Sequence, residues 1–99
     1  MWPDRLKDQP LAVEVWFYRE RKVSNYRKDG GLRLTARIYP TCSPDIDNCE
    51  KAVYDAMSGR LYRDDAQIVE AHLYKRYARL GESPRVELIA RPITDLLSL

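Results

Sequence analysis

Two aspartates, Asp45 and Asp47, stand two residues apart where a helical pattern begins. Carboxylate oxygens are the ligands that a hard cation such as Mg²⁺ prefers, and two or three carboxylates with a substrate phosphate are enough to hold this ion. Lys51 follows Asp47 by four residues, so both side chains share one helical face. This spacing would let an ammonium group approach a phosphate that is bound to the cation.

The same residues also have an ordinary structural explanation. Acidic side chains at a helix N-terminus are favoured by the helix dipole, and a lysine four residues after an aspartate can form a surface ion pair of little energetic consequence. Asp45, Asp47 and Lys51 taken alone do not decide between this explanation and a metal site.

Apolar spacing predicts the helix that would carry these residues. Side chains three or four residues apart form its inward face, namely Ile46, Cys49, Val53 and Met57. Start signals lie at 43–45 and stop signals at Ser58 and Gly59, so the helix is expected over 46–57. Asp55 falls on the outer face and is expected to be a surface acid.

Alternating side chains predict strands before and after this helix. Residues 11–20 place one apolar set on one face and a mixed set on the other: Leu11, Val13, Val15 and Phe17 against Glu14, Trp16 and Tyr18. A second strand is expected over 68–76, with His72 as a strand residue rather than a catalyst. A third strand is expected over 85–90, and a last helical turn over 92–99.

A basic loop over 21–43 connects the first strand to the helix. Between Arg19 and Arg37 the chain carries seven basic and two acidic residues, with tyrosines in or beside the loop. Basic side chains reach phosphates and tyrosines stack on unpaired bases, so the loop is expected to contact DNA, although a merely solvated loop has the same composition. The candidate contacts are Arg21, Lys22, Arg27, Lys28, Arg33 and Arg37.

Length and charge define the broad class of protein. We expect one domain over residues 1–99, with segments 11–20, 21–43, 44–69 and 70–99 as strand, basic loop, helix with acidic turn, and strands with a C-terminal segment. Residues 44–70 carry seven acids and three bases, a balance of −4, while the remainder carries +6. An acidic centre in a basic frame suits a metal enzyme that acts on a polyanion, although a charged helix face would also produce it.

Several classes of protein are excluded by the composition. No apolar run is long enough to span a membrane, and the opening residues do not form a signal peptide, so we expect a cytoplasmic protein. Cys42 and Cys49 are too few for a zinc ribbon and are expected to be reduced thiols.

The ordered string of motifs resembles the RusA family of endodeoxyribonucleases. Its first part reads Pro44-Asp45-Ile46-Asp47-Asn48, then Lys51-Ala52-Val53 and Asp55-Ala56-Met57, and its second part reads Tyr62, then Asp64-Asp65-Ala66-Gln67-Ile68-Val69. The resemblance is strong over residues 44–76 and loose over 11–43. Any single piece occurs widely, but the combination is specific.

The resemblance implies an α+β fold, with a small mixed β-sheet and a catalytic helix packed on one face. It implies Asp45, Asp47 and Asp65 as ligands of Mg²⁺, for which Mn²⁺ can substitute, and Lys51 as the catalytic lysine. Supporting roles fall to Asn48, Asp64 and Gln67, and Lys75 is a further DNA contact. The implied activity is the resolution of four-way (Holliday) DNA junctions by paired nicks in recombination or repair, carried out by a homodimer. The resemblance also implies a bacterial or phage-infected cell as the place of this activity.

The sequence departs from the family at its beginning and before the helix. Relatives begin with a further strand and helix, whereas about ten residues precede the first strand here, and Ser43 stands where many relatives have a basic residue. These departures bear on dimerisation and on junction selectivity. Two alternatives therefore stay open: a less selective nuclease of flaps or forks, and a catalytically impaired DNA-binding module of the same fold.

Overall fold

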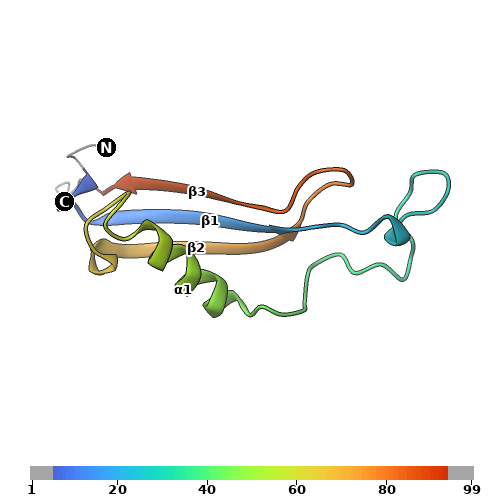
Figure 1. Ribbon diagram of the computed structural model, residues 1–99, viewed down its shortest axis with the longest axis horizontal. Helices are drawn as coiled ribbons and strands as arrows, with labels where there is room; N and C mark the ends of the chain where they lie inside the picture. Colours follow the sequence, from blue (N-terminus) through green and yellow to red (C-terminus); the bar gives the residue numbers. More distant parts are fainter. Residues whose placement is uncertain (1–5, 94–99) are drawn as a thin grey trace.

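The computed structural model describes residues 6–93, which form a three-stranded sheet with one α-helix against it (Figure 1). The central strand β1 (Leu11–Arg19) pairs in parallel with β2 (Ile68–Tyr77) and antiparallel with β3 (Arg85–Pro92). Because parallel neighbours need a long crossover connection, the loop and the helix lie between β1 and β2 in the chain. The expected small mixed sheet is confirmed.

Side-chain alternation gives the sheet two different faces. Val13, Val15 and Phe17 of β1 are buried with the helix, while Trp16 and its neighbours of the same parity point to the opposite side. Val15 lies between Leu73 and Leu88 in the register, which extends the apolar face across all three strands. One face therefore supplies the core, and the other has no α-helix on it in the described residues.

Helix α1 (Ile46–Met57) has the predicted bounds. Val53 is buried against the sheet, and Cys49 and Met57 pack against the same core, as their spacing predicts. Ile46 differs, since 41% of it is exposed. The spacing therefore places three of the four expected side chains in the core and leaves the first one at the surface.

The acidic turn after α1 closes on a second apolar cluster. Leu6, Leu11 and Tyr62 are buried together at this end of the sheet. Gly59 adopts a positive φ of 79° directly after the helix, a conformation that glycine takes without steric cost. A short 3₁₀ turn, η3 (Asp65–Gln67), then leads into β2.

The loop before α1 extends away from the sheet, to the right in Figure 1. The Cα radius of gyration is 17.1 Å, whereas a compact chain of this length has a value of about 13 Å. The loop contains the 3₁₀ turn η2 (Val23–Asn25) and a tight turn closed by a bridge between Tyr26 and Leu32. Most of its side chains can therefore reach a large partner.

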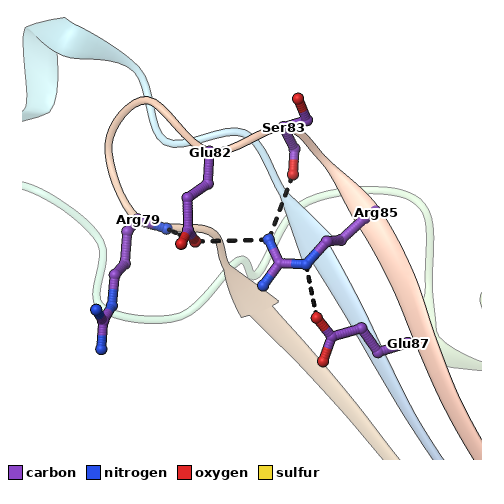
Figure 2. A network of polar contacts seen from close by, with 5 residues as sticks. All are labelled: Arg79, Glu82, Ser83, Arg85 and Glu87. Carbon is purple, nitrogen blue, oxygen red and sulfur yellow. Dashed lines mark hydrogen bonds and ion pairs between the residues drawn. The ribbon is translucent and has the colours of Figure 1, made fainter.

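A network of polar contacts fixes the turn between β2 and β3 (Figure 2). The guanidinium of Arg85 donates to Glu87 at 2.7 Å and lies 3.5 Å from Glu82. Glu82 also accepts from the backbone N–H of Arg79 at 3.1 Å. The strands therefore leave this turn in a defined register.

Three further expectations from the sequence concern the last helical turn, the cysteines and membrane-spanning segments. Pro92, the first residue of the predicted last helical turn, instead ends β3, and most of that turn (94–99) lies outside the described residues. Cys42 and Cys49 are both free thiols. Within residues 6–93, no helix has the length and apolar character needed to cross a membrane.

Candidate functional site

The start of α1 presents its polar side chains to solvent. Asp45, Asp47, Asn48 and Lys51 are all exposed. Asp45 occupies the N-cap position but forms no side-chain cap hydrogen bond, and Asp47 forms no ion pair with Lys51. Neither carboxylate is thus occupied by the cap or by the surface ion pair of the ordinary structural explanation, and both are available to a ligand.

Two basic side chains of the sheet hold the segment that leads into this helix. Arg19, at the end of β1, donates to the carbonyl of Ser43, and Lys75 of β2 donates from Nζ to the carbonyl of Cys42 at 2.8 Å. Lys75 is half-buried, and its ammonium is engaged in this contact. Its position therefore fixes the entry to Asp45, in addition to the DNA contact expected from the sequence.

The acidic turn is built around the amide of Gln67. Its Oε1 accepts from the backbone N–H groups of Arg63 at 2.8 Å and Asp64 at 2.9 Å. Its Nε2 donates to the carbonyls of Leu6 at 2.7 Å and Gln9 at 2.9 Å. Both donors and both acceptor positions of the amide are used. Gln67 thus ties the turn to the segment before β1.

Asp64 and Asp65 have different environments in this turn. The Oδ1 of Asp64 caps η3 by accepting from the backbone N–H of Ala66 at 3.0 Å. Asp65 is half-buried, and its Oδ1 and the hydroxyl of Tyr62 are buried without hydrogen-bond partners. Asp64 therefore caps this turn, whereas Asp65 carries a buried carboxylate oxygen close to the Tyr62 side chain.

Two tyrosines, one buried and one half-buried, have pKa values that the charge of Asp65 raises. Burial raises the pKa of Tyr62, and the negative charge of Asp65 raises it further. Burial also raises the pKa of Tyr54, together with its hydrogen bond to Glu50 at 2.8 Å and, more weakly, the charge of Asp65. Asp65 therefore faces the second half of α1.

The three expected metal ligands are not gathered into one group. Within residues 6–93, no three histidine, cysteine or acidic side chains lie close enough together to hold a metal ion. The charge of Asp65 contributes to the raised pKa of Tyr54. Tyr54 follows Asp45 by nine residues, which corresponds to roughly 13 Å along the helix axis. The carboxylates have the right chemistry for Mg²⁺, but the described residues do not bring three of them together around one point.

Most of the basic loop is open to solvent, with one exception. Arg21 is only 7% exposed, and its guanidinium donates to the carbonyl of Arg37 at 2.6 Å and lies 3.8 Å from the ring of Tyr77. Arg21 therefore holds the loop to the end of the sheet. The remaining expected contacts are exposed: Lys22, Arg27, Lys28, Arg33 and Arg37.

Sequence reasoning missed how two basic side chains position the site from a distance. Arg19 and Lys75 act on a segment that lies 24 and 33 residues away from them. Nothing in a local pattern reports a strand residue that binds a remote carbonyl. Tyr62 was part of the motif string, but its neighbouring carboxylate appears only when the turn is folded.

The fold and the site together define a small α+β domain whose helix start presents two carboxylates beside an extended basic loop. The model of the family described as Endodeoxyribonuclease RusA matches residues 1–89, and the chain belongs to this family. The resemblance noted in the acidic motifs is thereby confirmed.

The chain was also compared with individual proteins and with solved structures. The chain is 34% identical over 94 residues to the uncharacterized protein YqaN of Bacillus subtilis (strain 168). The matched region covers 93% of this chain and 64% of that protein, so the chain spans less than two thirds of the relative's length. No solved structure matches the chain.

Proposed function

We propose that this protein is a divalent-cation-dependent endodeoxyribonuclease that resolves four-way DNA junctions by paired nicks. The observation that carries the proposal is membership of the RusA family over residues 1–89. The exposed carboxylates of Asp45 and Asp47 and the exposed ammonium of Lys51 support it, because the sequence resemblance expects the family's acidic motif and lysine at these positions.

In this proposal Asp45, Asp47 and Asp65 are the ligands of Mg²⁺, with Mn²⁺ as a substitute. The cation would supply an activated water and neutralise charge on the phosphodiester. Asp65 is supported as a ligand by its Oδ1, which has no hydrogen-bond partner among the described residues. Because the three carboxylates are separated in the described residues, no reaction step is assigned to the cation.

Lys51 acts on the phosphate rather than on the metal. An ammonium cannot coordinate Mg²⁺, but it can stabilise negative charge that develops on the phosphate or on the leaving oxygen. Lys51 is exposed on the same helical face as Asp47 and forms no ion pair with it, so this aspartate does not neutralise its charge. DNA approaching this face would meet the carboxylates of Asp45 and Asp47 and the ammonium group of Lys51.

In this proposal the extended loop binds DNA, and the substrate is branched DNA. The exposed bases of the loop would contact backbone phosphates and would fix the position of the branch. Resolution of a junction needs two symmetric nicks, so we infer that the active species is a homodimer.

A DNA-binding module without catalytic activity is the second candidate. The separation of Asp65 from Asp45 and Asp47 favours it, since a protein that only binds DNA has no need of a complete metal site. The two candidates predict the same affinity for junctions and opposite results in a cleavage assay.

The test is a cleavage assay on a synthetic four-way junction, a linear duplex and a flap, each with Mg²⁺ and with chelator. Mg²⁺-dependent nicking of the junction alone supports the proposal. Equal cutting of all three substrates would indicate a less selective flap or fork nuclease. Binding of the junction without cutting at any concentration of Mg²⁺ or Mn²⁺ would establish the DNA-binding module instead.

A further inference from the structure

The sheet face opposite α1 carries a row of flat side chains, defined here as Trp16, Tyr74, Arg76 and Tyr39. The rings of Trp16 and Tyr74 are stacked with centroids 5.4 Å apart and planes inclined by 16°. The guanidinium of Arg76 lies 5.2 Å from the Tyr74 ring and 5.1 Å from the Tyr39 ring. The row therefore runs from β1 across β2 to the loop before α1.

Arg76 keeps its positive charge available, unlike the other arginine near this row. Arg85 lies 4.1 Å from the ring of Tyr18, but Glu87 and Glu82 pair with its guanidinium (Figure 2). Arg76 has no carboxylate partner in the described part of the chain and donates only to the carbonyl of Lys75, at 2.9 Å. A stacking cation without a counter-ion favours an anionic ligand.

The surroundings of the row also favour an anionic ligand that is extended. Tyr39 is 57% exposed at the loop end of the row. The loop itself carries seven bases and two acids between Arg19 and Arg37. A nucleic-acid strand whose bases lie on the row would thus have its phosphates near the basic side chains of this loop.

We propose that this row is a stacking site for the unpaired bases of single-stranded DNA. Aromatic rings and guanidinium planes stack on bases of any sequence, but the bases of an intact duplex already have both faces stacked on their neighbours. Unpaired bases occur where DNA branches. The inference rests on the proposed function only in taking DNA as the ligand, because the row lies on the face opposite Asp45 and Asp47.

The experiment measures binding of an oligo-dT strand by tryptophan fluorescence, with chelator present so that no cleavage occurs. A Trp2→Phe background leaves Trp16 as the reporter, and stacking of a base on the row is expected to quench its emission. Tyr39→Ala should weaken binding about tenfold. Arg76→Lys should also weaken it severalfold, because lysine keeps the charge but lacks the plane.

Arg91→Lys is the matched control, since Arg91 is an exposed arginine in β3 with no place in the row. The proposal is overturned if oligo-dT leaves the emission of Trp16 unchanged, or if the Arg76 and Arg91 variants bind equally well. It is also overturned if Tyr39→Ala keeps normal affinity but dissociates a dimer in sedimentation, which would make this face a contact between two copies. If the Tyr39 and Arg76 variants lost oligo-dT binding but still nicked junctions, this result would support the proposed stacking site and leave the proposed function intact.

Discussion

At the scale of single residues, the start of α1 separates groups that can hold a cation from one that cannot. Asp45 and Asp47 offer exposed carboxylates, and Lys51 offers an exposed ammonium on the same helical face as Asp47. A hard cation takes oxygen ligands only, so the aspartates and the lysine must fail in different ways when removed. Three residue-scale predictions follow from this difference and from the environment of Asp65.

Asp47→Asn should abolish nicking yet leave junction binding unchanged or tighter. The amide keeps the size of the side chain, removes a charge that would hold the cation, and reduces repulsion of phosphate. Cleavage rates and gel-shift affinities measure the two effects separately. Asp55→Asn is the matched control on the outer face of the same helix. Normal turnover by the Asp47 variant would remove this residue from the site.

Lys51→Ala should lower the plateau cleavage rate while sparing the half-saturating concentration of Mg²⁺. Removal of one electrostatic stabiliser costs on the order of a hundredfold in rate. Asp65→Ala should lower the rate and also raise the metal requirement. Titration of junction cleavage with Mg²⁺ distinguishes them. If excess Mg²⁺ restored the cleavage rate of Lys51→Ala, and Asp65→Ala kept a normal Mg²⁺ requirement, the roles proposed for both residues would be contradicted.

Tyr62→Phe should make the protein less sensitive to alkaline unfolding. The ordinary pKa of a tyrosine is 10.0, and burial together with the Asp65 charge raises that of Tyr62. Above pH 10.0 the unfolded chain releases this proton while the folded chain retains it, so stability is full below that pH and declines as the pH rises.

Urea unfolding of Tyr62→Phe between neutral and strongly alkaline pH tests this prediction. Its stability at neutral pH should be equal or slightly higher, because the lost hydroxyl has no hydrogen-bond partner. Tyr26→Phe in the extended loop is the control. An unchanged decline with pH in the Tyr62 variant would place the alkaline sensitivity at another group.

At the scale of elements, local patterns predicted the helix and strands, but not what joins them. Helix α1 has the predicted bounds because its apolar spacing and its stop at Gly59 are local signals. Strand β3 continues to Pro92, where a helical turn was expected, because pairing with β1 extends it beyond its alternating core. The contacts of Gln67 with Leu6 and Gln9 span 61 and 58 residues, a distance that no sequence period encodes.

Gln67→Ala should therefore destabilise the fold beyond the loss of an ordinary surface side chain. It removes four hydrogen bonds, two within the acidic turn and two that join this turn to the segment before β1. Because water replaces some of them, we expect a loss of about 1–3 kcal/mol. Urea unfolding gives the value, with Gln9→Ala as the control for an exposed glutamine side chain. Equal stability of the two variants would show that the amide does not join these segments.

At the scale of the whole molecule, shape and charge separate DNA binding from the acidic motifs. The extended loop accounts for a radius of gyration of 17.1 Å in a chain of 99 residues. Residues 44–70 carry a balance of −4, while the rest of the chain carries +6. The composition predicted this division, but only the structure shows that Arg21 is buried while its neighbours in the loop are exposed.

Neutralising the exposed bases of this loop should weaken junction binding and flatten its dependence on salt. Each phosphate contact contributes roughly 0.9 to the logarithmic slope on duplex DNA, so loss of four contacts would lower the slope by between three and four. The variant replaces Lys22, Lys28, Arg33 and Arg37 with glutamine. Arg21 is kept, because its removal would disturb the loop itself.

Binding measured across a range of salt concentrations gives the slope directly. A double variant of Lys22 and Lys28 can be matched in charge by one of Arg60 and Arg91, which are exposed outside the loop. The loop pair should lower the slope by nearly two, since each lysine would lose one phosphate contact, whereas the control pair should lower it little. Equal changes in both pairs would mean that only the net charge attracts DNA. An unchanged slope in the loop pair would show that these lysines do not contact phosphates.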